Sequence, residues 1–297
     1  MIYRVSHTTD YEYHDPVALS HHVLRLHPRE LARQSCVSHE VDIEPKPCSV
    51  AAHVDYFGNA ASVIEIDQPH TRLVLRSVST VVCKPARHLD PMETASWDQV
   101  RNFSRGVQIG AALEASEFLY DSPLIKMDDA FAEYAAASFP KSRPTLAAVL
   151  DLTRRIHDDF TFDQEATTVS TPVRDVLKKR RGVCQDFAHL EIACLRSLGL
   201  PARYVSGYIE TIAPPGKEKL VGSDASHAWI SFYCPGLGWI DVDPTNNLVV
   251  SEQHITVAWG RDYSDISPVR GVILGSGEHE VTASVEVQKL QTQENKP

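Results

Sequence analysis

The stretch RGVCQDFAHL, residues 181–190, says more about the fold than any other part of the chain. Gly182 allows a tight turn, and Cys184 then falls in the first turn of a helix. Apolar side chains recur at helical spacing as far as Leu198, where Gly199 provides a helix exit. The free N–H groups at a helix N-terminus favour a thiolate over a thiol. The pattern therefore predicts a helix that begins with a reactive cysteine.

Two later segments supply the partners that a thiol nucleophile needs. SHAWI (226–230) and GWIDVDPT (238–245) read as neighbouring strands of a hairpin that turns at PGLG, residues 235–238. His227 on the first strand could deprotonate the thiol. Asp241 and Asp243 on the second are both candidates for the carboxylate that orients this base. The order of these residues along the chain and the adjacency of the two hairpin strands predict a Cys-His-Asp triad. Such a triad would make the chain an acyl-transfer enzyme working through a thioester.

Simpler interpretations compete with this one. A cysteine on an amphipathic helix is more often a core residue than a nucleophile, and a catalytically silent binding module is an alternative function. The six cysteines form no CxxC pair, so they indicate neither a zinc knuckle nor a disulfide framework. Among them only Cys184 has a reason to be reactive. The histidines of the first 70 residues are spread over several expected strands and turns, and surface or packing roles are favoured over a metal site.

The pattern along the chain predicts an α+β protein with two domains. Residues 1–100 read as an N-terminal β-sandwich-like domain and a linker, with a Thr-Thr-Asp turn at 8–10 and a hairpin turn at Gly58-Asn59. Residues 101–297 carry helical patterns first and short strands afterwards, up to a strand at 279–288. This order predicts a core of helices packed on an antiparallel sheet.

Composition limits the partners and the location. The net charge of −10 argues against nucleic acid or an anionic membrane as a partner. No apolar run approaches the length of a membrane span, and the first residues have no signal-peptide core, so a cytoplasmic location is expected. The sequence does not indicate an oligomeric state.

These motifs resemble the transglutaminase-like superfamily of papain-type thiol enzymes. The resemblance rests on GVCQDFA, on LGLPARYVSGY (198–208), on SHAW and on GWIDVDPTN, with no departure at the triad positions. It extends to a bacterial subgroup with an N-terminal β domain, through LRLHP (24–28), FGN (57–59) and VAWGRDYSD (257–265). The resemblance therefore covers most of the chain.

The resemblance implies a papain/transglutaminase-like core and a triad of Cys184, His227 and Asp243, because the family's acid precedes Pro-Thr. It implies a cysteine peptidase or amidase that hydrolyses an amide in a peptide or peptide-like substrate, with transamidation as the alternative. Trp229, beside the base, and Tyr208 are expected to contact the substrate. The chain has no calcium loop of the kind that animal transglutaminases require, so no metal or other cofactor is expected.

Overall fold

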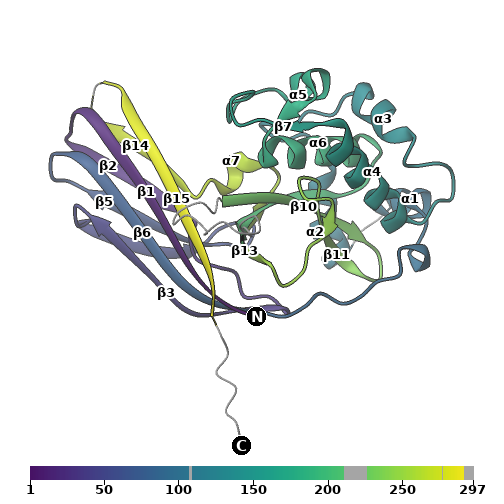
Figure 1. Ribbon diagram of the computed structural model, residues 1–297, viewed down its shortest axis with the longest axis horizontal. Helices are drawn as coiled ribbons and strands as arrows, with labels where there is room; N and C mark the ends of the chain where they lie inside the picture. The colour runs from purple at the N-terminus through teal and green to yellow at the C-terminus, as the bar shows by residue number, and fades with distance from the viewer. Residues whose placement is uncertain (107–108, 211–225, 276, 291–297) are drawn as a thin grey trace, which may run out of the picture.

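The computed structural model describes residues 1–106, 109–210, 226–275 and 277–290. It contains a β sandwich and, beside it, a second part in which helices cover one face of a sheet (Figure 1). This is the mixed α+β architecture that the sequence predicts. No helix of the described residues is both long and apolar enough to cross a membrane.

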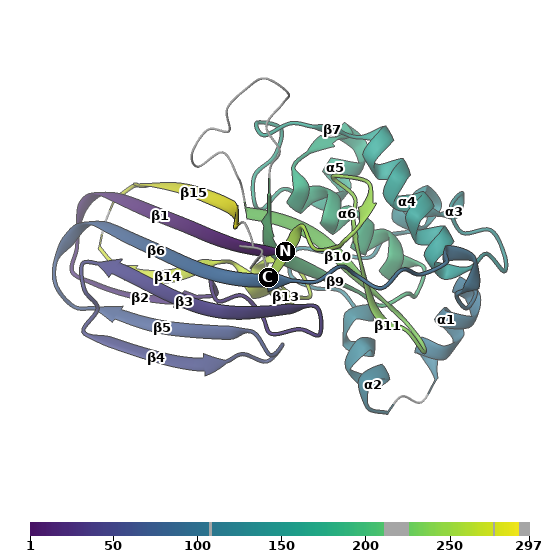
Figure 2. The same cartoon turned by 60° about the horizontal axis from the view of Figure 1, so that its bottom comes forward.

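Two four-stranded antiparallel sheets form the sandwich, with strand orders β15-β1-β6-β3 and β14-β2-β5-β4. The two layers lie face to face in Figure 2. Apolar side chains on alternate strand positions point into the space between them, and Leu73 and Leu75 of β6 are fully buried there with Ile64 and Ile66 of β5. The strands are β1 (Ile2–Val17), β2 (Leu19–Leu24), β3 (Gln34–Glu44), β4 (Ser49–Val54), β5 (Ala60–Ile66), β6 (His70–Cys83), β14 (Val269–Leu274) and β15 (His279–Leu290).

Two features of the sandwich differ from the sequence expectation. Residues 8–10 do not turn: they continue β1, with Thr9 buried and paired to Leu75. Threonine suits an extended strand, and the alternation of buried positions runs through it without a break. The expected strand at 279–288 exists, but β15 pairs with β1 of the sandwich rather than with the core, and β14 pairs with β2. The chain therefore returns to the sandwich after completing the second part.

The second part is built around α6 (Cys184–Ser197), which packs against other helices and against β9 and β10. Its five-stranded antiparallel sheet has the order β12-β11-β10-β9-β13. The expected boundary after residue 100 falls inside a short helix, α1. The elements are η1 (Pro91–Glu93), α1 (Trp97–Arg105), α2 (Ala111–Ser116), η2 (Glu117–Leu119), α3 (Asp129–Ala136), α4 (Thr145–Asp159), β7 (Thr161–Phe162), α5 (Val173–Lys179), β8 (Arg181–Gly182), β9 (Ala202–Ile209), β10 (Ser226–Cys234), β11 (Gly238–Asp243), β12 (Leu248–Val249), β13 (His254–Gly260) and α7 (Tyr263–Ile266).

The sheet of the second part curls strongly. Asp243 ends β11 and His254 begins β13, and two other strands separate these elements in the sheet order. Their side chains nevertheless meet, with His254 Nε2 3.1 Å from Asp243 Oδ2. The curl encloses Trp229, which is fully buried. It therefore gathers polar residues from β10, β11 and β13 near one end of the sheet.

The sandwich is held to this sheet through β13. The Gln34 side chain accepts a hydrogen bond from the Thr256 backbone N–H and donates to the Thr256 carbonyl. The Asn59 side chain bonds in the same way to the N–H and carbonyl of Trp259. β13 is an edge strand, and each amide makes the two backbone hydrogen bonds that a further strand would make with it. The two parts are therefore joined by specific polar contacts as well as by packing.

Candidate active site

Cys184 is the first residue of α6 and is partly exposed. The start of the helix is fixed by Asp186, whose carboxylate accepts hydrogen bonds from the Val183 backbone N–H at 2.8 Å and from the Thr167 hydroxyl at 2.6 Å. A Cβ at Gly182 would lie 2.6 Å from the same carboxylate oxygen. Glycine is therefore required here by the close approach of Asp186, and this contact holds the thiol at the helix N-terminus.

His227 stands between the thiol and a buried carboxylate. His227 lies on β10 and Asp243 at the end of β11, the strand that pairs with β10 in the predicted hairpin. His227 Nε2 is 2.7 Å from Asp243 Oδ2, and the two side chains are 8% and 0% exposed. Cys184 is also close enough to His227 to raise the pKa of the imidazole. Because Nε2 is engaged by the carboxylate, Nδ1 is the ring nitrogen left for the sulfur.

The electrostatics favour a charged imidazole. Burial acts to lower the pKa of His227, but hydrogen bonds and charges from Asp243 and Cys184 outweigh it and raise the pKa to about 10. Burial acts to raise the pKa of Asp243, but hydrogen bonds from His227 and His254 hold it below its usual range. The carboxylate therefore stays ionised, and the imidazole retains a proton at neutral pH.

Asp243 is held by more donors than the sequence suggests. Its Oδ1 accepts from the backbone N–H groups of Thr245 and Asn246, at 2.9 and 3.2 Å. Its Oδ2 accepts from the Asn246 side chain at 2.7 Å and from His254 Nε2 at 3.1 Å. Asn246 belongs to the DPTN motif, but His254 lies eleven residues after Asp243, and only the curl of the sheet brings it here.

The competing carboxylate lies elsewhere. Asp241 Oδ2 is 3.5 Å from Trp229 Nε1 and 3.5 Å from a guanidinium nitrogen of Arg33. It has no hydrogen bond to His227 among the described residues. The geometry therefore pairs Asp243 with the imidazole, as the resemblance implies.

The two residues expected to contact the substrate are both buried. The Trp229 ring lies beside His227 and His254, with ring centroids 6.1 and 5.1 Å away. Tyr208 is 3% exposed, and its hydroxyl is 2.8 Å from His7 Nδ1 of β1, in the sandwich. Trp229 thus shields the imidazole from water, and Tyr208 joins the second part to the sandwich. Direct contact of either residue with a substrate stays a prediction.

Among the described residues, one group of side chains at this same place could hold a metal ion. Within the part of the chain that the structure describes, His227, Asp243 and His254 have ligand atoms within 4.8 Å of one another. The Asn246 amide donates to the same Asp243 oxygen, and hydrogen bonds account for every close contact in the group. The expectation of a metal-free site remains untested.

Comparison with protein families gives two matches. Residues 3–82 match the bacterial transglutaminase-like N-terminal region, and residues 133–244 match the transglutaminase-like superfamily. These are the two resemblances that the sequence motifs suggest.

Two relatives and one solved structure are also similar to this chain. An uncharacterized protein of Mycobacterium tuberculosis is 41% identical over 291 residues, which cover 94% of this chain and 90% of the relative. The protein-glutamine gamma-glutamyltransferase of Pseudomonas aeruginosa is 34% identical over 107 residues, 35% of this chain and 16% of the relative. The crystal structure of "a Putative Cysteine Protease" from Cytophaga hutchinsonii has the same fold, with a TM-score of 0.76 at 23% identity over 99% of this chain and 92% of that one.

Proposed function

Because the chain belongs to the transglutaminase-like superfamily, we propose that it is a cysteine-dependent enzyme that hydrolyses an amide bond in a peptide or peptide-like substrate. The observation that carries the proposal is the position of His227, which is hydrogen-bonded to Asp243 and close enough to Cys184 for the thiol to raise its pKa. This is the arrangement that activates a thiol nucleophile and later supplies a proton to the leaving group.

The chemistry follows from the geometry. The Cys184 thiolate attacks the amide carbonyl, and the backbone N–H groups at the start of α6 donate to the resulting oxyanion. The carbon–nitrogen bond then breaks, His227 gives its proton to the leaving amine, and a thioester remains on Cys184. Water, deprotonated by His227, attacks the thioester, releases the acid and restores the thiol. Asp243 keeps the imidazole in the tautomer and orientation that both half-reactions need.

Transamidation is the second candidate function. It differs only in the last step, where an amine rather than water attacks the thioester. The similarity to a protein-glutamine gamma-glutamyltransferase over 107 residues supports this alternative. Product analysis in the presence of a primary amine distinguishes the two outcomes, because only transamidation yields the new amide.

The test is the pH dependence of Cys184 alkylation by iodoacetamide, followed by peptide mass spectrometry. Cys48, an exposed cysteine in the same digest, is the internal reference. We expect Cys184 to react well below pH 7, where Cys48 does not, and we expect His227→Ala to abolish this difference. Equal pH profiles for the two cysteines in the wild-type protein would contradict the proposal and favour a silent binding module.

A further inference from the structure

A pocket of about 360 Å³ lies where the sandwich, the linker and the curled sheet meet. We call it the junction pocket. Its walls come from residues 31–33 before β3, from the linker at 85–89, and from β9, β11, β12 and β13. None of its lining residues belongs to the Cys184, His227 and Asp243 group. Its volume is in the range of sites that hold small ligands.

One wall of the junction pocket is a buried arginine without a polar partner. Arg203 of β9 is 7% exposed, and its guanidinium is stacked between Trp239 and Trp259, 4.0 and 3.7 Å from the two ring centroids. Its Nε is buried without a hydrogen-bond partner. Within the described ranges, no carboxylate forms an ion pair with it. Burial lowers the pKa of Arg203 to about 9, although nearby Asp241 opposes the shift. A buried charged donor without a partner is costly, so its presence needs an explanation.

The junction pocket holds more positive than negative charge. Arg33 and Arg87 line it together with Arg203, and Asp241 is the one carboxylate among the lining residues. Asp241 is 3.5 Å from Arg33, which also donates to the Ser251 carbonyl at 3.1 Å. Arg87 is exposed and makes no hydrogen bond or ion pair with the described residues. Two guanidinium groups, those of Arg203 and Arg87, are therefore free to bind an anion.

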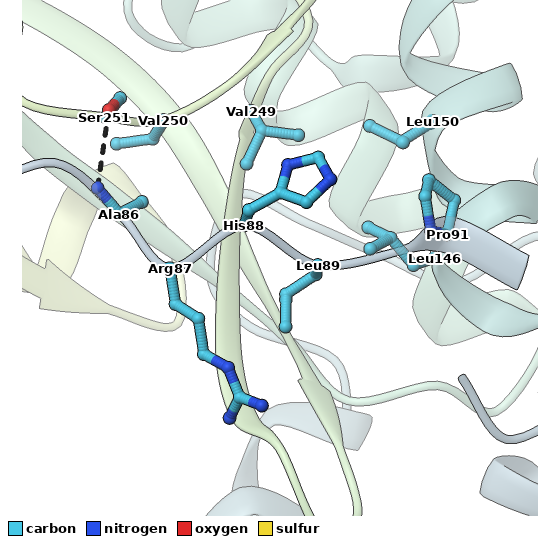
Figure 3. A pocket seen from close by; sticks show the side chains of 10 residues that line it. All are labelled: Ala86, Arg87, His88, Leu89, Pro91, Leu146, Leu150, Val249, Val250 and Ser251. Atoms are coloured by element: carbon cyan, nitrogen blue, oxygen red, sulfur yellow. Dashed lines mark hydrogen bonds between the residues drawn. The ribbon is translucent and has the colours of Figure 1, made fainter. Parts of the chain in front are cut away.

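The linker directs Arg87 toward this pocket. In Figure 3 the side chains of Arg87 and Leu89 leave the extended linker on one side and His88 leaves it on the other. Arg87 and Leu89 line both the junction pocket and an adjoining pocket of about 390 Å³ next to Leu146 and Leu150 of α4, whereas His88 lines only the adjoining pocket. Alternation along the extended chain thus places one cation and one apolar side chain in the junction pocket.

We propose that the junction pocket binds a carboxylate carried on a small apolar body, with Arg203 and Arg87 as its binding residues. A guanidinium presents parallel N–H donors that match a carboxylate, and stacking on tryptophan keeps the Arg203 group rigid. Leu31, Leu89, Leu237 and Val250 supply apolar walls for the remainder of the ligand. This binding activity does not depend on the thiol chemistry, so Cys184→Ala should bind the ligand as wild type does.

The experiment is calorimetric titration of the full chain with sodium hexanoate at constant ionic strength. Hexanamide is the uncharged analogue, and inorganic phosphate is the second anion. We expect saturable binding of hexanoate, weaker binding of hexanamide, and a rise in Kd of about tenfold or more in Arg87→Gln, the loss expected for a hydrogen bond between charged groups. Arg4→Gln, which removes an exposed charge on β1, should leave the Kd unchanged.

Arg87 is exposed, so its substitution is compatible with folding, and circular dichroism checks this. Arg203→Met should weaken hexanoate binding at least as strongly as Arg87→Gln does. Three results would overturn the proposal: no saturable heat with hexanoate, equal affinity for hexanoate and hexanamide, or arginine-dependent binding of phosphate alone. Absence of binding would mean that water satisfies the Arg203 guanidinium. Equal affinity for the two compounds would mean that the pocket recognises only the apolar chain, and binding of phosphate alone would mean that the ligand is a different anion.

Discussion

Replacing Glu191 by glutamine should change how the stability of the protein depends on pH. Glu191 lies on α6 and is fully buried. Its Oε1 is 2.7 Å from the Thr153 hydroxyl oxygen, which is also 2.9 Å from the Val149 carbonyl. The hydroxyl has a single proton to donate, so both contacts are hydrogen bonds only if Glu191 is protonated and donates to Thr153. The second carboxyl oxygen is buried without a partner, as suits a neutral acid.

The size of this change in the free energy of unfolding follows from the pKa of Glu191. Burial raises the pKa of Glu191 from 4.5 to about 8. Below pH 4.5 the folded and unfolded states are both protonated at this residue. Between pH 4.5 and about 8 the unfolded state has lost the proton while the folded state keeps it, so the free energy of unfolding falls with rising pH. At about 1.4 kcal/mol per pH unit, the total loss is about 3–5 kcal/mol.

Glu191→Gln removes this titration while keeping the shape and the ability to donate to Thr153. Urea unfolding followed by tryptophan fluorescence, at several values between about pH 5 and about pH 8, gives the free energy of unfolding. The variant should gain stability relative to wild type as the pH rises. Glu133→Gln, on the exposed side of α3, is the control and should show no such trend. A difference between Glu191→Gln and wild type that stays constant with pH would refute the assignment of a neutral acid.

Four further substitutions test the site and its scaffold. Gly207→Ala should lower the free energy of unfolding by about 3 kcal/mol or more, because the new Cβ would lie 2.0 Å from a backbone carbonyl of β13; thermal unfolding measures this. Asp243→Asn should slow Cys184 alkylation at about pH 6 by about tenfold or more, because asparagine no longer holds the charged imidazole of His227 in the orientation that stabilises the thiolate. Asp241→Asn should leave that rate nearly unchanged, and the opposite ranking would reassign the acid. The alkylation rate of His254→Leu should fall between those of Asp243→Asn and Asp241→Asn, because leucine removes one donor from Asp243 but leaves the charge of the carboxylate. A rate equal to wild type would mean that the contact does not position the carboxylate.

The sequence predicts the local part of the candidate site well. The helix from Cys184, with its glycine exit, and the hairpin that carries His227 and Asp243 both depend on neighbouring residues, and the structure contains both. The pairing of β10 with β11 then brings the imidazole to the carboxylate without any long-range information. Short-range patterns therefore suffice wherever the contacts are made within one helix or one hairpin.

Other features depend on contacts between distant segments. His254 reaches Asp243 only because the sheet curls, and no spacing in the sequence encodes that curl. The uninterrupted course of β1 is set by its partners β6 and β15, whose pairing overrides the turn tendency of Thr-Thr-Asp. The sequence likewise does not predict that Arg203 is buried without a polar partner. That environment is formed by two tryptophans and a linker from distant parts of the chain.

The return of β15 to β1 has a consequence for biosynthesis. The first six strands leave the ribosome before the helices, but their sheets gain β14 and β15 only after the whole second part has been made. The roughly 200 residues between Cys83 and Leu290 take roughly 10–40 s to translate. During that time β1 presents an open edge, the kind of surface that recruits foreign strands. We expect the nascent chain to be most vulnerable to aggregation in this interval, and a chaperone that covers the edge of β1 would act there.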